Sequence, residues 1–259
     1  MNFTDEQLIN LMTSYLWPFS RIAAFTAVVP IFGTRVVPAR MRLLIAISLT
    51  LVIVPILPAP ETEIDPLGFE GLLVTAAQVM IGLVMGFAVK LVMSAIETGG
   101  HVIAQTMGLG FAQMNDPANG VTVPVVSQFY IIMATLVFLA LNGHLVMIDI
   151  LAESFSMLPV AMQGVSQDGL WVLISWSSWI FTGAVLIALP AVVALLLVNI
   201  AFGVMMRAAP QLNVFAVGFP LTLTLGFVFM LASLPIFLPQ FNNLLEGAFM
   251  TVGNIVSAR

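Results

Sequence analysis

The chain has 259 residues, of which 61% are hydrophobic and 7% are charged, and its formal net charge is -5. With a mean hydropathy of +1.12, it has too few charged side chains to cover the surface of a water-soluble protein of this size. Seven lysines and arginines also exclude the clustered basic surface that a nucleic acid partner requires. The composition therefore predicts an integral membrane protein that contacts lipid or partner proteins.

Six long apolar segments predict an all-α membrane protein, because about 20 apolar residues in a helix cross a hydrocarbon core roughly 30 Å thick. The chain starts with MNFTDEQLIN, which has Asp5 and Glu6 where a secretory signal carries basic residues, so we expect the first segment to be retained. The predicted segments are Leu8 to Phe32, Leu43 to Leu57, Leu67 to Met93, Val125 to Ile150, Leu170 to Met206 and Val214 to Leu238.

The connections between these segments alternate in charge. The first carries Arg35, Arg40 and Arg42, which is typical of a cytoplasmic connection, and the next is acidic, with Glu61, Glu63 and Asp65. Counting charges in this way predicts that both termini lie on the outer side of the membrane.

The fifth segment is too long for one simple span, because no charge occurs between Asp168 and Arg207 and a helix rises about 1.5 Å per residue. Pro190 lies in its interior and removes a backbone donor. We therefore expect two half-helices or a folded hairpin there, packed against protein neighbours.

Two glycines in the third segment, Gly82 and Gly86, form a GxxxG pattern. Such a pattern lets two helix backbones approach closely inside a membrane. It predicts helix packing, with a partner either in this chain or in another.

The stretch from Glu97 to Pro124 combines five glycines, two prolines and two asparagines with apolar side chains. A continuous helix is not expected from Gly108 onward, because Gly, Asn and Asp-Pro favour turns. Irregular backbone with almost no charge is tolerated at membrane depth only inside protein or beside a cavity. Two interpretations stay open: a deformable plug in a pore, or a re-entrant loop packed between helices.

Three cations lie within or near the apolar segments, namely Arg21, Lys90 and Arg207. Each either reaches the lipid headgroups or pairs with a carboxylate of another subunit. Glu97 lies two helical turns after Lys90 and shares its predicted helix face.

The sequence predicts no enzyme. The chain has no cysteine and only two histidines, His101 and His144, so thiolate and clustered imidazole sites are excluded. The stretch from Gly164 to Asp168 lacks the second glycine of a nucleophile elbow. We expect no catalytic, cofactor-binding or metal-binding residues.

The segment RAAPQLNVF from Arg207 to Phe215, followed by Gly218-Phe-Pro220, resembles the hallmark segment of the FliR/SctT family of export-gate proteins. The loop from Gly108 to Pro117 is similar to the glycine-rich segment of the same family. Both motifs occur in the family's order, so the resemblance covers essentially the whole chain.

The resemblance implies one export-gate domain over residues 1–259, a FliP-like part followed by a FliQ-like part, with about six long helices arranged as kinked hairpins in a helical assembly. It implies FliP and FliQ as partners, FlhB at the pore entrance, and unfolded flagellar proteins as substrates. The expected location is the flagellar basal body in the bacterial inner membrane, partly raised toward the periplasm. The flagellar gate is the first expectation, an injectisome subunit of the SctT type is the second, and a small-solute secondary transporter and a structural scaffold are further alternatives.

The resemblance also assigns roles to residues. The pore plug is expected at Met107, Gly108, Gly110, Phe111, Met114, Asn115 and Pro117. Contacts with other subunits are expected at Arg207, Pro210, Gln211, Asn213, Lys90 and Glu97, and helix packing is expected at Gly82 and Gly86.

Overall fold

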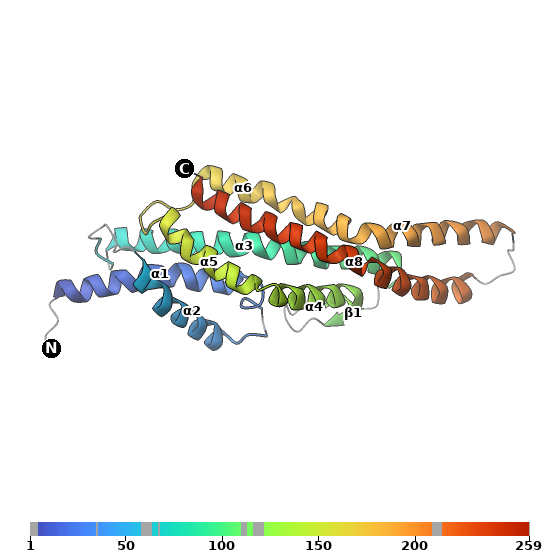
Figure 1. The fold of residues 1–259 in the computed structure, drawn as a ribbon, viewed down its shortest axis with the longest axis horizontal. Coiled ribbons are helices and arrows are strands. Elements are labelled where there is room, and N and C mark those ends of the chain that lie inside the picture. The colour runs from blue at the N-terminus through green and yellow to red at the C-terminus, as the bar shows by residue number, and fades with distance from the viewer. Residues whose placement is uncertain are drawn as a thin grey trace. The chain divides into compact units, whose positions relative to one another are not determined.

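A computed structural model of the chain describes residues 5–34, 36–57, 64–66, 68–109, 113–115, 122–208 and 214–258. Within these residues the chain forms eight α-helices, one 3-10 helix (η1) and two short β-strands (Figure 1). Their bounds are α1 Asp5–Val28, α2 Ala39–Ile53, η1 Val54–Ile56, α3 Phe69–Thr106, β1 Gln113–Asn115, β2 Thr122–Pro124, α4 Val125–Ala140, α5 Gly143–Met157, α6 Gln167–Ser177, α7 Trp179–Ala208 and α8 Val214–Ser257.

The predicted fold class is confirmed, because the described residues are almost entirely helical. Four helical stretches among them are long and apolar enough to cross a membrane, or five if the bent pair α4 and α5 counts as one span. The number and bounds of the helices nevertheless differ from the six predicted segments.

The third helix runs to Thr106 rather than to Met93. Gly99 and Gly100, two of the five glycines in the stretch from Glu97 to Pro124, lie inside this helix and serve close packing. A Cβ atom on Gly99 would lie 3.0 Å from the Ala184 carbonyl oxygen of α7, and one on Gly100 would lie 2.6 Å from Ser127 Cα of α4. Because Gly99 and Gly100 have no side chains, the backbones of α7 and α4 can lie close to the backbone of α3.

The fourth and fifth predicted segments each form two helices. Asn142 ends the fourth, because its φ of 57° is left-handed, a conformation that asparagine tolerates better than most residues. The fifth breaks at Ser178, whereas Pro190 lies inside the continuous helix α7. The expected break at Pro190 is thus wrong in position.

The last helix continues to Ser257 instead of ending near Leu238. The predicted segment ended there because Pro239 and several polar residues follow. Buried Phe241, Leu244 and Leu245 recur at the spacing of one helix face, so tertiary packing extends the helix past the proline.

The chain forms two compact units that alternate along the sequence. The first, called unit 1, comprises Met1–Lys90, Asn142–Ser177 and Gly247–Arg259, and the second, called unit 2, comprises Leu91–Leu141 and Ser178–Glu246. Helices α3 and α8 each contribute one part to each unit.

In unit 1, helices α1 and α3 pack through the predicted GxxxG pattern. A Cβ atom on Gly82 would collide with the carbonyl oxygen of Arg21, and one on Gly86 would lie 3.0 Å from the Phe25 carbonyl oxygen. The Trp176 indole of α6 also donates a hydrogen bond to the Ala88 carbonyl of α3, at 3.3 Å. The two glycines therefore lie against a helix of the same chain.

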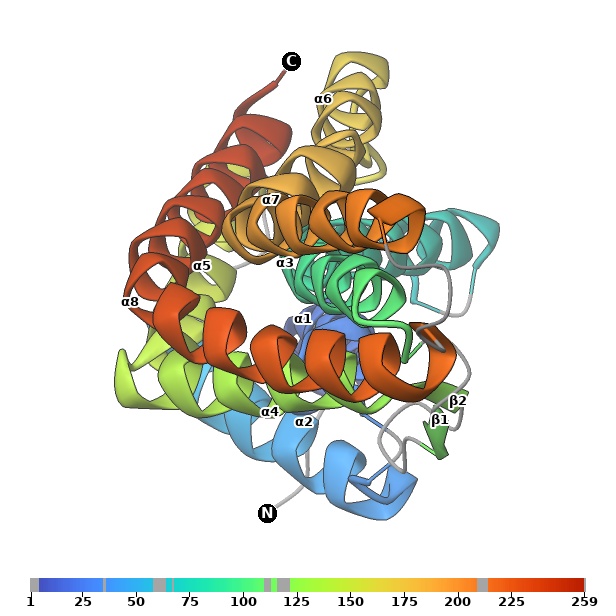
Figure 2. The same cartoon turned by 90° about the vertical axis from the view of Figure 1, so that its right-hand side faces the viewer.

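In unit 2, α4 and α8 meet through aromatic rings, with Tyr130 and Phe237 centred 5.6 Å apart and Phe237 and Phe241 stacked at 5.7 Å. Helices α7 and α8 pack where Gly183 lies against Leu244. Figure 2 shows α4, α7 and this part of α8 around the end of α3.

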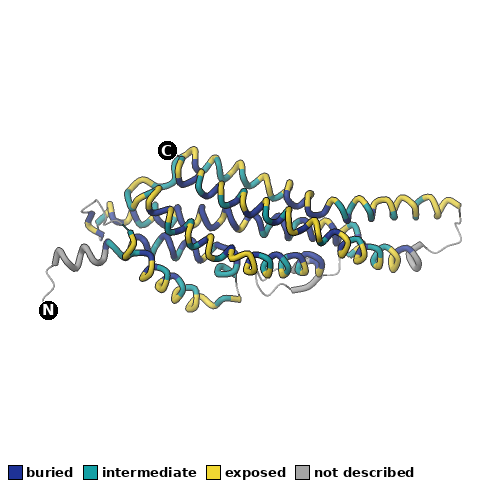
Figure 3. The backbone as a smooth tube through the Cα atoms, in the orientation of Figure 1, coloured by how far each residue is buried: buried dark blue, intermediate teal, exposed yellow. Residues whose placement is uncertain are grey.

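Helix α2 buries little of its surface, and Figure 3 shows mostly exposed or half-exposed positions along it. Only Ala46, Thr50 and Ile53 are buried, whereas Leu44, Leu51 and Val52 are more than half exposed. The stretch Ala39–Ile56 of 18 residues is about 27 Å long, close to the thickness of a hydrocarbon core. Lipid or another apolar partner must cover this helix.

Candidate functional site

The plug-like segment begins at a well-defined helix end. Gly108 takes a left-handed φ of 77°, its N–H donates to the Gln105 carbonyl at 3.1 Å, and the Leu109 N–H donates to the Ala104 carbonyl at 2.9 Å. These two bonds form a Schellman motif, which satisfies carbonyls at the end of α3. Glycine suits this position because other residues are strained at positive φ.

The residue before this glycine anchors the helix end inside unit 2. Met107 is fully buried and lies directly over Gly226 of α8, where a Cβ atom would be 2.6 Å from the Met107 terminal methyl carbon. A Cβ atom on Gly108 would lie 3.4 Å from the Phe219 ring of the same helix. Met107 and Gly108, both predicted to belong to the plug, thus lie at a helix end that packs against α8.

Beyond this base the chain forms a short antiparallel hairpin of β1 and β2, in which Gln113 pairs with Pro124, Met114 with Val123 and Asn115 with Thr122. Strands of three residues carry too short an alternation to be recognised in a sequence, and none was predicted here. Helix α4 starts immediately after Pro124, so helices of unit 2 hold both ends of the excursion.

Several predicted plug residues lie outside the described residues, namely Gly110, Phe111 and Pro117. Of Met114 and Asn115 the structure describes the backbone, which lies in β1. The expected plug stays a prediction. The described part of this segment starts at the capped helix end formed by Met107 and Gly108.

A second feature is an arginine in unit 1 whose burial was not expected from the sequence. Arg21 of α1 is fully buried and its guanidinium makes five hydrogen bonds, to Gln78 of α3, to Ser154 and to the Leu158 carbonyl at the end of α5. The Phe155 ring centroid lies 4.2 Å from its guanidinium carbon.

The bonds of Arg21 explain how a cation is tolerated in this interior. Two of its acceptors, the carbonyls of Ser154 and Leu158, lie at the C-terminal end of α5, where a helix carries partial negative charge and unpaired carbonyls. The two interpretations offered for Arg21, reaching lipid headgroups or pairing with another subunit, are both wrong. It joins α1, α3 and α5 within one unit.

The other predicted contact residues are placed as follows. Lys90 is exposed on α3, Glu97 is half-buried further along that helix, and Arg207 is exposed in the last turn of α7. A cation there is favourable because it lies near the helix C-terminus. Pro210, Gln211 and Asn213 lie outside the described residues, so the contact roles stay predictions.

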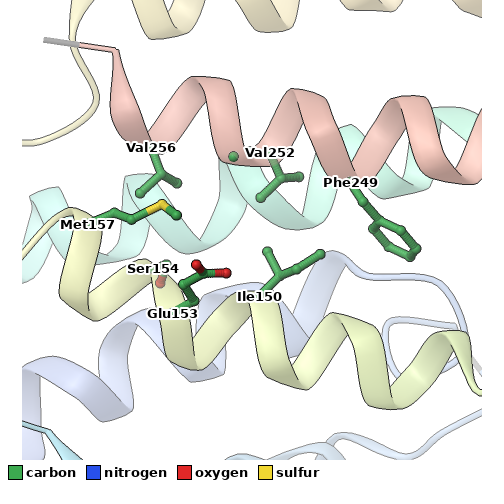
Figure 4. A pocket seen from close by; sticks show the side chains of 8 residues that line it. Ile150, Glu153, Ser154, Met157, Phe249, Val252 and Val256 are labelled. Atoms are coloured by element: carbon green, nitrogen blue, oxygen red, sulfur yellow. The ribbon is translucent and has the colours of Figure 1, made fainter.

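A small cavity opens between α5 and α8 in unit 1 (Figure 4). Its volume is about 70 Å³, room for the end of one side chain or a few waters and well below the roughly 300–1,000 Å³ of a small-molecule pocket. Its lining residues are Ile150, Glu153, Ser154, Met157, Phe249, Val252, Gly253 and Val256. In the described part of the chain, no three His, Asp or Glu side chains are grouped to hold a metal ion.

Comparison with known proteins gives the family. The family model described as "Bacterial export proteins, family 1" matches residues 12–248. The chain is similar to the flagellar biosynthetic protein FliR of Escherichia coli, with 35% identity over 99% of this chain and 98% of that protein. It is also similar to FliR of Aquifex aeolicus, with 31% identity over 95% of this chain and 93% of that protein. FliR of Bacillus subtilis is 29% identical over 97% of this chain and 98% of that protein. The chain therefore belongs to family 1 of the bacterial export proteins, the family to which the flagellar biosynthetic protein FliR belongs.

Proposed function

We propose that this protein is the FliR-type subunit of a flagellar type III export gate, and that the hairpin segment after α3 is its pore plug. The observation that carries the proposal is the family match over residues 12–248, together with the relatives named flagellar biosynthetic protein FliR over almost their whole length. As in the sequence analysis, no catalytic role is proposed.

The plug proposal is supported by the way the segment is mounted. A plug must move while its base stays fixed, and the base is a capped helix end with Met107 buried on Gly226. A hairpin with two three-residue strands can be displaced at low cost, because an isolated two-stranded ribbon is marginally stable. Glycine and methionine in the segment would let it deform around a passing chain.

The partners and the location follow from the same proposal. The gate assembly contains FliP and FliQ, FlhB lies at its entrance, and unfolded flagellar proteins pass through it. The assembly belongs to the flagellar basal body in the bacterial inner membrane, with its helices partly raised toward the periplasm. Helices such as α3, with 38 residues, are about 57 Å long, so much of their length needs protein neighbours rather than lipid.

The alternatives have less support. The relatives compared carry a flagellar name, which favours the flagellum over an injectisome. A secondary transporter needs a polar solute site near the midplane, and the relatives compared carry the name flagellar biosynthetic protein FliR instead of a transporter name.

The test of the plug is a shortened loop. Deleting residues 111–120 and joining the ends with two glycines keeps Met107, Gly108 and α4 while removing the obstruction. We expect cells or proteoliposomes that carry the complete gate to leak ions, and we expect Gly203→Ala on α7, where nothing lies within 4 Å of the new methyl group, to leave the gate sealed. A shortened loop with unchanged permeability and normal export would contradict the plug.

A further inference from the structure

The cavity between α5 and α8 contains one unneutralised acid in an apolar lining. Figure 4 shows the Glu153 side chain pointing from α5 into the space beside α8. Around it lie Ile150, Met157, Val252 and Val256, and the side chain of Glu153 is exposed. Among the described residues, no lysine or arginine forms a salt bridge with Glu153.

A second acid increases the negative charge of this surface. Asp149 lies four residues before Glu153 on α5 and is also exposed, so the two carboxylates share one helix face. Like charges at this spacing destabilise a helix slightly. The pair therefore favours a cation from outside the chain, which would remove the repulsion.

The shape of the cavity restricts what that cation can be. Its volume of about 70 Å³ accepts the end of one side chain, and Gly253 on α8 leaves open space, because nothing lies within 4 Å of a Cβ atom built there. The apolar wall suits the methylene stem of a lysine or an arginine, and Glu153 suits its charged head.

We propose that the groove of α5 and α8 around Glu153 is a docking site for a helix of a neighbouring gate subunit, which inserts a lysine or arginine side chain into the cavity. The inference rests on the proposed function, since it needs a neighbouring subunit. A partner that covered the groove without a cation would bury an unpaired carboxylate, which is strongly unfavourable. The cavity thus selects a basic helix.

Two pairs of variants test the docking site in the full gate, extracted in mild detergent. Glu153→Gln removes the charge, and Glu70→Gln is its control, because Glu70 is an exposed acid at the start of α3. Gly253→Leu fills the cavity and keeps the acid, and Gly203→Leu is its control, because nothing lies within 4 Å of a Cβ atom at either glycine.

We expect Glu153→Gln and Gly253→Leu each to lower the amount of at least one co-isolated subunit by about tenfold or more, and the controls to leave it unchanged. Far-UV circular dichroism of the purified chain should be the same for all four variants. Equal co-isolation for Glu153→Gln and Glu70→Gln would overturn the docking site while leaving the gate proposal intact. Failure of the unaltered chain to co-isolate any subunit would instead overturn the proposed function.

Crosslinking identifies the occupant. The chain has no cysteine, so Met157→Cys places a single thiol at the cavity, and a short thiol-reactive photoprobe on it labels whatever lies there. The expected adduct is a peptide of another subunit within one helical turn of a lysine or arginine. An adduct only with phospholipid, or with a peptide lacking basic residues, would overturn the proposal.

Discussion

Replacing Arg21 by methionine tests the central contact of unit 1. The substitution keeps an unbranched side chain and removes all five hydrogen bonds of the guanidinium. The Ser154 carbonyl still accepts from the Leu158 N–H, and the Ser154 hydroxyl still donates to the Leu151 carbonyl. Two acceptors lose their donors, namely Gln78 Oε1 and the Leu158 carbonyl oxygen.

Each buried acceptor left without a donor costs about 1–3 kcal/mol, so the free energy of unfolding should fall by about 2–6 kcal/mol. For a protein of this size that corresponds to a decrease of about 4–24 °C in the melting temperature. Adding Gln78→Leu removes one orphaned acceptor, so the double variant should recover part of the loss, because an apolar pair of similar volume needs no hydrogen bonds.

The measurement is thermal unfolding of the full chain in detergent, followed by far-UV circular dichroism, which reports the loss of helix. Arg40→Met is the control, because Arg40 is an exposed arginine on α2. Equal melting temperatures for Arg21→Met and Arg40→Met would show that the hydrogen bonds of Arg21 do not stabilise unit 1. A double variant less stable than the single one would show that Gln78 makes a stabilising contact with a residue other than Arg21.

Three further predictions concern glycines, and thermal unfolding measures each against Gly203→Ala, which has open space around it. Gly226→Ala should lower stability by about 1–3 kcal/mol through collision with Met107, and Met107→Ala in the same chain should relieve the collision; additive losses would contradict the contact. Gly108→Ala should cost about 1–2 kcal/mol, because φ is 77° there, and Gly108→Asn should cost less; equal stability of both variants would count against the left-handed cap. Gly82→Ala should lower stability by about 1–3 kcal/mol, because its methyl group meets the Arg21 carbonyl; a loss no larger than that of Gly203→Ala would contradict the close approach of α1 and α3.

Much of the fold could be predicted from local signals. Apolar stretches of membrane length identify the helices, and α3 ends at the left-handed Gly108, the residue from which the sequence predicted no continuous helix. Both signals depend on neighbouring residues only, which is why composition and turn propensity reveal them.

The errors in the helix bounds and in the role of Arg21 have one physical cause, which is packing between residues far apart in the chain. The predicted third segment ended at Met93, yet α3 continues through Gly99 and Gly100, which lie against the backbones of α7 and α4. Arg21 looked like a membrane-edge cation, yet its acceptors Gln78, Ser154 and Leu158 lie 57, 133 and 137 residues away. No local pattern marks such partners, since tertiary contacts override local preference.

The most direct test of the gate is contact with a substrate in transit. A photoreactive amino acid replaces Phe111 in the full chain, in cells whose export substrate carries a folded domain that stalls it in the gate, and Leu197, an exposed residue of α7, is the matched position. We expect an adduct with the stalled substrate from position 111 and none from position 197. No adduct at position 111, or equal adducts at both positions, would contradict the proposed gate.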